Sequence, residues 1–401
     1  MKLEAQAPAA GRRGPWARGT DRRTFLAACG GAVASFAAGP SIDETLRSGI
    51  ARRKIPCVAA MAADAKGKTL YSGAFGARTD SIFAIASMTK AITTVAALQL
   101  VEQGKVSLTE PVSKHLPQLA DLQVWDGTSL HPAKKAVTLH HLLTHTAGFC
   151  YDTWDGEMFR YVSQHPPKPG DKPGPLMFEP GTRWQYGQGC DWAGRLVEAV
   201  SGKTLEQYFQ DHILKPLGMN DTSYIMTAEK FDRMVTRYHR DESGALVEEE
   251  RKLPARPTSF NGGGGLYSTT ADYVKFMQAI LNGGTGILKP KTVESMKVNQ
   301  IGASTAGKMK SYRPGNSSDV DMQPGHTEKW TYGFLMNTTA YEGGRSAGSL
   351  AWAGLYNTYY WIDPKRRICG VILMQYLPFA DKEAIGLLGE FERAVYGTMM
   401  Q

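Results

Sequence analysis

Segments typical of β-strands lie near both ends of this 401-residue chain, while helical patterns and long loops dominate its middle. Five runs have the residue content of strands: 57–63, 69–75, 332–338, 357–362 and 369–375. Helical spacing of apolar residues marks 41–54 near the start and 380–396 near the end. This distribution predicts an α/β fold of the α+β type, in which both chain ends build one antiparallel sheet flanked by helices.

The middle of the chain has its clearest helical patterns at 138–143, 191–201 and 205–213. We therefore expect a mostly helical lobe from about 86 to 265. It would be inserted into an α/β lobe made of about 41–85 and 266–401, so that 39–401 form one domain. A cleft between two such lobes is a common place for a ligand site.

Residues 1–38 are predicted to be a twin-arginine signal segment. Arg22 and Arg23 stand in the run DRRTFL, and a modestly apolar stretch rich in small residues follows from 27 to 38. Such a leader predicts export and a periplasmic or secreted protein, whereas the alternative is an Ala/Gly-rich disordered tail. No later apolar run approaches the roughly 18–20 residues of a membrane span, so we expect no stable membrane insertion.

The net charge of +8 does not indicate a nucleic-acid partner. Six cations and two carboxylates lie within 1–38, so that segment carries half of the charge, and no dense Lys/Arg run follows residue 54. The five cysteines lack C-x-x-C spacing, which argues against a zinc framework. We expect the four outside the leader to be free, buried core residues.

The run Ser87-Met88-Thr89-Lys90 opens an apolar helical stretch that ends near Gly104. Positions i and i+3 share a helix face, so the Ser87 hydroxyl and the Lys90 amine are predicted to lie side by side. Burial would lower the pKa of Lys90 and let it act as the base for a serine nucleophile. The simpler alternative is a serine that only caps a helix.

Two further segments could complete a catalytic site. Tyr186 lies after a turn, and a phenol at the mouth of a cleft can shuttle a proton. The run Trp352-Ala353-Gly354-Leu355 precedes a strand, and we expect an edge strand here whose backbone N–H groups reach a substrate oxygen. Taken singly, Tyr186 fits an ordinary packing residue better, and the Trp352 run fits an ordinary junction between a loop and a strand.

Together these segments resemble the serine hydrolases related to class C β-lactamases and D,D-peptidases, over roughly residues 41–397. Further landmarks of that superfamily are LLTHTAG (142–148), PLGM (216–219) and GGGLYST (263–269). The resemblance implies Ser87 as nucleophile, Lys90 as adjacent base and Tyr186 as the tyrosine of a Tyr-x-Asn motif. Two departures, Gln188 for that Asn and Trp352-Ala353-Gly354 for Lys-Thr-Gly, make the chain similar to the family VIII carboxylesterases.

The resemblance implies a serine esterase that acts on small uncharged esters through an acyl-enzyme, with no cofactor and no metal, and the leader implies its export. The N–H groups of Ser87 and Leu355 would hold the oxyanion, while Gly354, Trp352 and Gln188 would line the substrate site. The alternatives are a β-lactamase or D,D-carboxypeptidase, an acyltransferase, and a catalytically dead binding module. The oligomeric state stays open. Six aromatic residues could form an apolar pocket or the core: Phe149, Tyr151, Trp154, Phe159, Phe178 and Trp184.

Three other patterns are less consistent with catalysis. Ser346 fits G-x-S-x-G, but a Gly-rich loop precedes it where a nucleophile elbow needs a strand. The run 261–265 lacks the G-K-[ST] ending of a phosphate loop and is expected to form a wall of the cleft. His140, His141 and His145 have no carboxylate at ligand spacing, so we expect packing residues.

Overall fold

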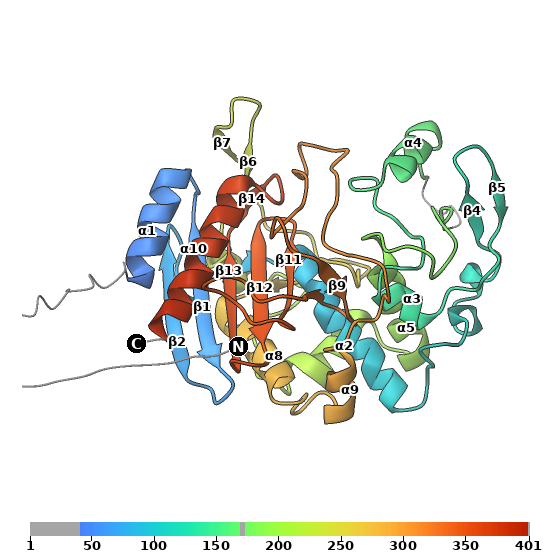
Figure 1. The fold of residues 1–401 in the computed structure, drawn as a ribbon, viewed down its shortest axis with the longest axis horizontal. Coiled ribbons are helices and arrows are strands. Elements are labelled where there is room, and N and C mark those ends of the chain that lie inside the picture. The colour runs from blue at the N-terminus through green and yellow to red at the C-terminus, as the bar shows by residue number, and fades with distance from the viewer. Residues whose placement is uncertain (1–40, 169–172, 400–401) are drawn as a thin grey trace, which may run out of the picture. The chain divides into compact units, whose positions relative to one another are not determined.

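A seven-stranded sheet joins the two ends of the chain in the computed structural model, which describes residues 41–168 and 173–399 (Figure 1). The strand order is β2-β1-β13-β12-β11-β10-β9, and every neighbouring pair is antiparallel. The strands are β1 (Val58–Asp64), β2 (Thr69–Phe75), β9 (Glu328–Trp330), β10 (Leu335–Asn337), β11 (Leu350–Gly354), β12 (Thr358–Asp363) and β13 (Ile368–Leu373). The prediction of an antiparallel sheet built from both chain ends is confirmed.

Helices cover both faces of this sheet. Strands β12 and β13 are buried along their whole length, which explains their continuous apolar sequences. Tyr360 packs against Tyr273 of α8 (Thr270–Leu281), with ring centroids 4.9 Å apart. The next residue, Trp361, points to the opposite face and meets Phe391 of α10 (Lys382–Thr398) at 5.6 Å. The alternation of side chains along β12 therefore anchors a helix on each face.

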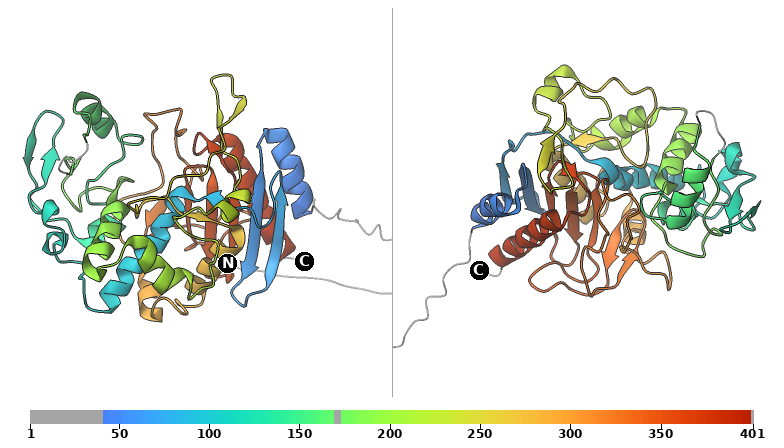
Figure 2. Two further views of the ribbon diagram at one scale, coloured as in Figure 1. Left: turned by 180° about the vertical axis from the view of Figure 1, so that it is seen from behind. Right: turned by 90° about the horizontal axis from the view of Figure 1, so that it is seen from above.

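Helix α1 (Ile42–Arg53) lies beside α10, as Figures 1 and 2 show. Ser41 caps it in a capping box with Glu44, which satisfies free N–H groups of its first turn. At the other end, Arg53 pairs with Glu383 at 2.8 Å and Glu390 at 2.7 Å, both on α10. These contacts fasten the N-terminal helix to the C-terminal one.

The regular structure between β3 (Phe83–Ala84) and β8 (Tyr267–Ser268) is mainly helical, with long loops between the helices, as predicted. It contains α2 (Thr89–Glu102), α3 (Leu139–Leu143), α4 (Gly156–Gln164), α5 (Gly189–Ser201), α6 (Leu205–Phe209) and α7 (Ala228–Asp232), with the short turns η1 (Ala86–Met88), η2 (Val112–Lys114), η3 (Pro117–Leu119) and η4 (Gln210–Leu214). The remaining elements are α9 (Pro290–Ser295) and the short strands β4 (Gln123–Trp125), β5 (Leu130–Pro132), β6 (Tyr238–Arg240), β7 (Leu246–Glu248) and β14 (Tyr376–Leu377). Strands β3 to β9 and β14 were not expected from the sequence.

Helix α2 is buried on all sides from Thr89 to Leu100, because it runs through the core and packs on α5. Cys57, Cys150, Cys190 and Cys369 are free and buried, which confirms that prediction. In the part of the chain that the structure describes, no helix combines the length and the apolar character required to span a membrane. The expected leader, 1–38, lies outside the described residues.

Candidate active site

Ser87 lies in η1, the single turn that leads directly into α2. The preceding residue, Ala86, has a φ of 42°, a left-handed backbone conformation that is uncommon for a residue with a side chain. Lys90 lies one turn further on, and its Nζ is 3.0 Å from Ser87 Oγ. The structure therefore brings the predicted nucleophile and its lysine together.

The Lys90 ammonium is only 1% exposed and meets three acceptors. They are Ser87 Oγ at 3.0 Å, the Tyr151 hydroxyl at 3.3 Å and the Gly263 carbonyl at 2.6 Å. An ammonium has three N–H donors and no acceptor, so this set matches the charged form of the side chain. The expected wall at 261–265 thus contributes a backbone oxygen to the site.

The expectation that burial lowers the pKa of Lys90 is wrong. Burial alone would lower this pKa, but the phenols of Tyr151 and Tyr186 and the carboxylate of Asp191 favour the charged form and raise it. Sequence spacing could indicate the apolar surroundings of Lys90 but not these tertiary neighbours. In the resting enzyme Lys90 is therefore an ammonium that donates to Ser87.

Tyr151 and Asp191 are site residues that the sequence did not reveal in this role. The Tyr151 hydroxyl donates to Asp191 Oδ2 at 3.3 Å, and Asp191 Oδ1 accepts the Gly263 N–H at 2.8 Å. Burial raises the pKa of Asp191, although the Lys90 charge opposes that shift. Burial also raises the pKa of Tyr151 well above its ordinary range, so its hydroxyl stays protonated. A continuous hydrogen-bonded chain thus runs from Ser87 through Lys90 and Tyr151 to Asp191.

Tyr186 approaches the same ammonium through its ring. The Lys90 Nζ lies 5.0 Å from the centroid of the Tyr186 ring, while the Tyr186 hydroxyl accepts a hydrogen bond from Trp352 Nε1 at 3.1 Å. Both aromatic side chains are almost fully buried. The polar group of Trp352 is thereby committed to Tyr186, while a place for its ring in the substrate site stays a prediction.

Strand β11 brings a second set of N–H groups close to Ser87. It is not the expected edge strand, because β10 and β9 lie outside it. However, β10 pairs only with Leu350 and Ala351, which leaves the backbone of 352–354 unpaired on that side. Gly354 is required at its end, since a Cβ there would lie 2.2 Å from the Ile85 carbonyl oxygen.

This contact places Leu355 beside the turn that carries Ser87. In the described part of the chain, the backbone N–H groups of Ser87 and Leu355 are used by no hydrogen bond outside regular helices and strands. Two free N–H groups flanking the nucleophile are what a tetrahedral oxyanion requires. Gln188, at the N-cap of α5, is exposed and lines a cavity with Tyr151 and Asp191.

The remaining sequence patterns lie apart from this chemistry. Ser346 follows a loop and precedes β11, and its N–H is bonded to Asp363, so the strand–serine–helix arrangement is absent there. His145 is buried against the rings of Trp330 and Tyr186, as expected of a packing residue. Residues 41–168 and 173–399 contain no group of His, Cys, Asp and Glu that could hold a metal ion.

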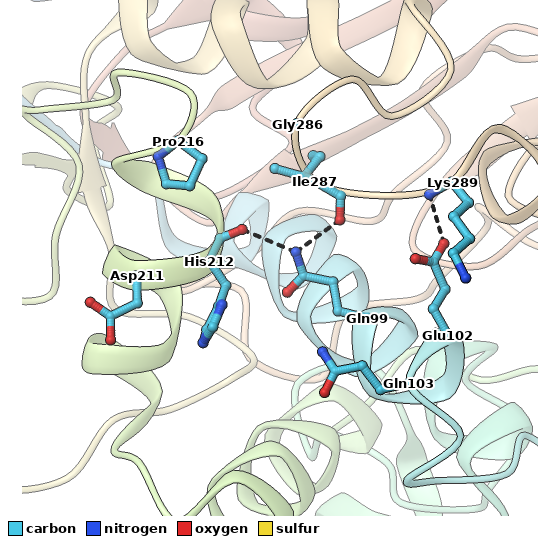
Figure 3. A pocket seen from close by; sticks show the side chains of 9 residues that line it. All are labelled: Gln99, Glu102, Gln103, Asp211, His212, Pro216, Gly286, Ile287 and Lys289. Carbon is cyan, nitrogen blue, oxygen red and sulfur yellow. Dashed lines mark hydrogen bonds between the residues drawn. The ribbon is translucent and has the colours of Figure 1, made fainter.

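Another pocket lies at the opposite end of α2 from Ser87 (Figure 3). It measures about 330 Å³ and is lined by polar groups, including Gln99, Glu102 and His212. The Gln99 amide donates to the carbonyls of His212 and Ile287, at 3.0 and 2.9 Å. No serine or cysteine is among the nine residues that line it, so this pocket offers no such nucleophile.

Comparisons with known proteins give the family of the chain. The family model described as Beta-lactamase matches residues 42–390. Lovastatin esterase from Penicillium rubens is 32% identical over 370 residues, covering 83% of this chain and 92% of the esterase. Monacolin J acid methylbutanoyltransferase from Aspergillus terreus is 29% identical, covering 92% of this chain and 98% of the transferase. A solved mutant of simvastatin synthase from A. terreus superimposes with a TM-score of 0.79 at 28% identity, covering 90% and 98% of the two chains.

Proposed function

The chain belongs to the beta-lactamase family of serine hydrolases, as an enzyme that acts on esters, and we propose that it is a carboxylesterase with an acyl-enzyme on Ser87. The observation that carries the proposal is the 3.0 Å contact between Ser87 Oγ and Lys90 Nζ, beside two unused N–H groups. Nucleophile, proton acceptor and oxyanion donors are the three parts that acyl transfer needs.

Acylation begins with attack of Ser87 Oγ on the ester carbonyl carbon. The Ser87 proton moves to Lys90 as Lys90 passes one to Tyr151 and Tyr151 passes its own to Asp191, along the hydrogen bonds of 3.0, 3.3 and 3.3 Å. The raised pKa of Asp191 suits the end of such a relay, because it makes the carboxylate a stronger base. The N–H groups of Ser87 and Leu355 hold the oxyanion.

Collapse of the tetrahedral intermediate breaks the bond to the alcohol oxygen, which takes the Tyr186 proton as the alcohol leaves. The resulting phenolate is stabilised by the Trp352 N–H and by the nearby charge of Lys90. In deacylation, water gives a proton to this phenolate and attacks the acyl carbon. Release of the acid then returns the proton from Asp191 to Ser87 along the same relay, which restores the resting site.

Transfer to an alcohol in place of water is the second candidate. It needs no change in the site, because an alcohol can give its proton to the Tyr186 phenolate as water does. The observation that favours it is the similarity to an enzyme named as a methylbutanoyltransferase over 92% of this chain.

A β-lactamase or peptidase fits the site less well. Gln188 and Trp352 stand where those enzymes have Asn and Lys, and the three acceptors around Lys90 do not include Gln188. The expected preference for small uncharged esters rested on the loss of that Lys. Since the Trp352 N–H donates to Tyr186, the preference for charged or uncharged substrates must depend on other residues. Export by the twin-arginine route remains part of the proposal and rests on residues 1–38 alone.

The test is to measure turnover of p-nitrophenyl butyrate and of a chromogenic cephalosporin, and to locate the adduct of an organophosphonate by mass spectrometry. We expect ester turnover to exceed cephalosporin turnover by at least about a hundredfold in kcat/KM, about 2.7 kcal/mol. The adduct should lie on Ser87, and Ser87→Ala should abolish turnover while Ser346→Ala retains it. An adduct on Ser346 would refute the proposal.

A further inference from the structure

Two cavities open beside the active site on the side of Tyr151. One, of about 350 Å³, is lined by Tyr151 and Asp191, and by Phe260 further out. The other, of about 500 Å³, has Phe149 and Met158 among its walls. Three residues line both cavities: Gln188, which precedes α5, and Trp192 and Arg195, which lie on it. The two cavities adjoin at these three residues, and Tyr151 of the first one bonds to Lys90. We call the two cavities together the channel.

Several charged groups along the channel already interact with other groups of the protein. Both oxygens of Asp191 accept hydrogen bonds, from Tyr151 and from Gly263. Glu198 accepts the N–H of Leu205 at 2.8 Å. Lys168 lines the outer cavity and has interactions of its own.

Arg195, by contrast, has an aromatic neighbour and no ion pair among the described residues. Its guanidinium lies over the Trp192 ring at 4.3 Å, and no carboxylate of residues 41–168 or 173–399 is within ion-pair distance of it. Arg195 is exposed, so its N–H groups are accessible from the channel. A guanidinium over an indole keeps its N–H groups available, and these can bind a carboxylate through two parallel hydrogen bonds.

We propose that Arg195 selects esters whose alcohol part carries a carboxylate at the end of an apolar chain. The inference rests on the proposed function and names its substrate class. The alcohol part is assigned to the channel because the ring of Tyr186, which gives its proton to the leaving alcohol, lies 5.6 Å from that of Tyr151 in the channel wall. Apolar contacts with Phe149, Met158 and Trp192 would hold the chain, and the carboxylate would pair with Arg195.

The test uses two substrates that differ only in charge, 6-butyryloxyhexanoate and 6-butyryloxyhexanamide, with release of butyrate as the readout. We expect the wild type to prefer the carboxylate by about tenfold in kcat/KM, mostly through KM, and the preference to shrink as salt is raised. Arg195→Gln should remove the preference and change amide turnover by less than about twofold. Arg195→Lys should keep part of it, since an ammonium is a point charge without the bidentate fork.

Arg47→Gln is the matched control, because Arg47 also covers an aromatic ring, that of Phe75, at 4.7 Å on α1. It should leave the preference unchanged. Equal turnover of both substrates by the wild type would overturn the inference while leaving the esterase in place. Equal losses on both substrates in Arg195→Gln would also overturn it, by showing that Arg195 only supports Trp192. If neither substrate nor p-nitrophenyl butyrate is hydrolysed, the proposed function itself fails.

Discussion

The indole N–H of Trp352 donates to the hydroxyl of Tyr186 over 3.1 Å, and neither side chain is more than 3% exposed. The two residues come from different parts of the fold, one from β11 and one from the loop before α5. This bond orients the Tyr186 hydroxyl and stabilises negative charge on its oxygen. Trp352 is thus a positioning residue for the phenol, which explains why an aromatic residue with a donor stands there.

Trp352→Phe should slow the reaction by removing this donor. A hydrogen bond to a developing phenolate is worth roughly 1.5 kcal/mol, so kcat should fall about tenfold. KM for p-nitrophenyl butyrate should change little, because the indole N–H does not face the substrate. The measurement is steady-state kinetics on enzyme whose folding is checked by thermal unfolding.

Trp330→Phe provides the control for this experiment. Trp330 packs 4.7 Å from Trp352 in the same aromatic cluster, but its N–H bonds only to the carbonyl of Leu143. It should cost stability without changing kcat per folded molecule. Similar losses of kcat in both variants would show that catalysis depends on packing of the aromatic cluster and not on the Trp352 N–H donor.

Asp191→Asn should alter the acid side of the pH profile. The relay needs Asp191 as a carboxylate, so kcat/KM must fall as the pH drops through its pKa. Because burial raises that pKa above the ordinary value of about 3.9, the wild-type profile should decline at a correspondingly higher pH. Asparagine cannot accept the proton, so kcat should drop by at least about a hundredfold and this acid limb should vanish.

Glu198→Gln tests whether the fall of kcat/KM at low pH is caused by protonation of Asp191. Glu198 lies on the same helix and lines the same cavity, but its carboxylate bonds to the Leu205 N–H outside the relay. The acid limb of this variant should match that of the wild type. A limb that persists in Asp191→Asn would assign the proton acceptor to another group.

Sequence patterns predicted the parts of this molecule that depend on local spacing. Ser87 and Lys90 are one turn apart, so their contact follows from helix geometry. The central strands β12 and β13 were recognisable because burial on both faces imposes continuous apolar runs. Strand β11 was expected, but at the edge of the sheet, because a sequence pattern does not give the order of strands that lie outside it.

Contacts between distant segments could not be predicted in this way. Asp191 reaches the site only through Tyr151 and Gly263, which lie 40 and 72 residues away in the chain. The pKa of Lys90 is raised by Tyr151, Tyr186 and that carboxylate, and none of these contacts could be predicted from the spacing around Lys90. The role of Trp352 likewise depends on a partner 166 residues away.

Replacing Arg22 and Arg23 by lysine should block export. The twin-arginine machinery reads the arginine pair, so the double variant should accumulate in the cytoplasm as folded, active enzyme. Cell fractionation with an ester assay measures the distribution. Arg12 and Arg13 form a second pair in the same segment, and their replacement by lysine should leave export intact. Normal delivery of the Arg22/Arg23 variant would contradict this route.

Gly354→Ala should damage the oxyanion site. A Cβ at this position would lie 2.2 Å from the Ile85 carbonyl oxygen and 2.4 Å from Thr358 Oγ1, so β11 must move away from the turn that carries Ser87. Moving the Leu355 N–H by even a fraction of an ångström weakens the bond to the oxyanion, and kcat should fall at least about a hundredfold. Overpacking should also lower the free energy of unfolding by roughly 1–3 kcal/mol.

Gly315→Ala is the control, because a Cβ there meets no atom within 4 Å, and both kcat and the free energy of unfolding should stay at the wild-type level. If Gly354→Ala loses stability but keeps its kcat, the Leu355 N–H is not an oxyanion donor.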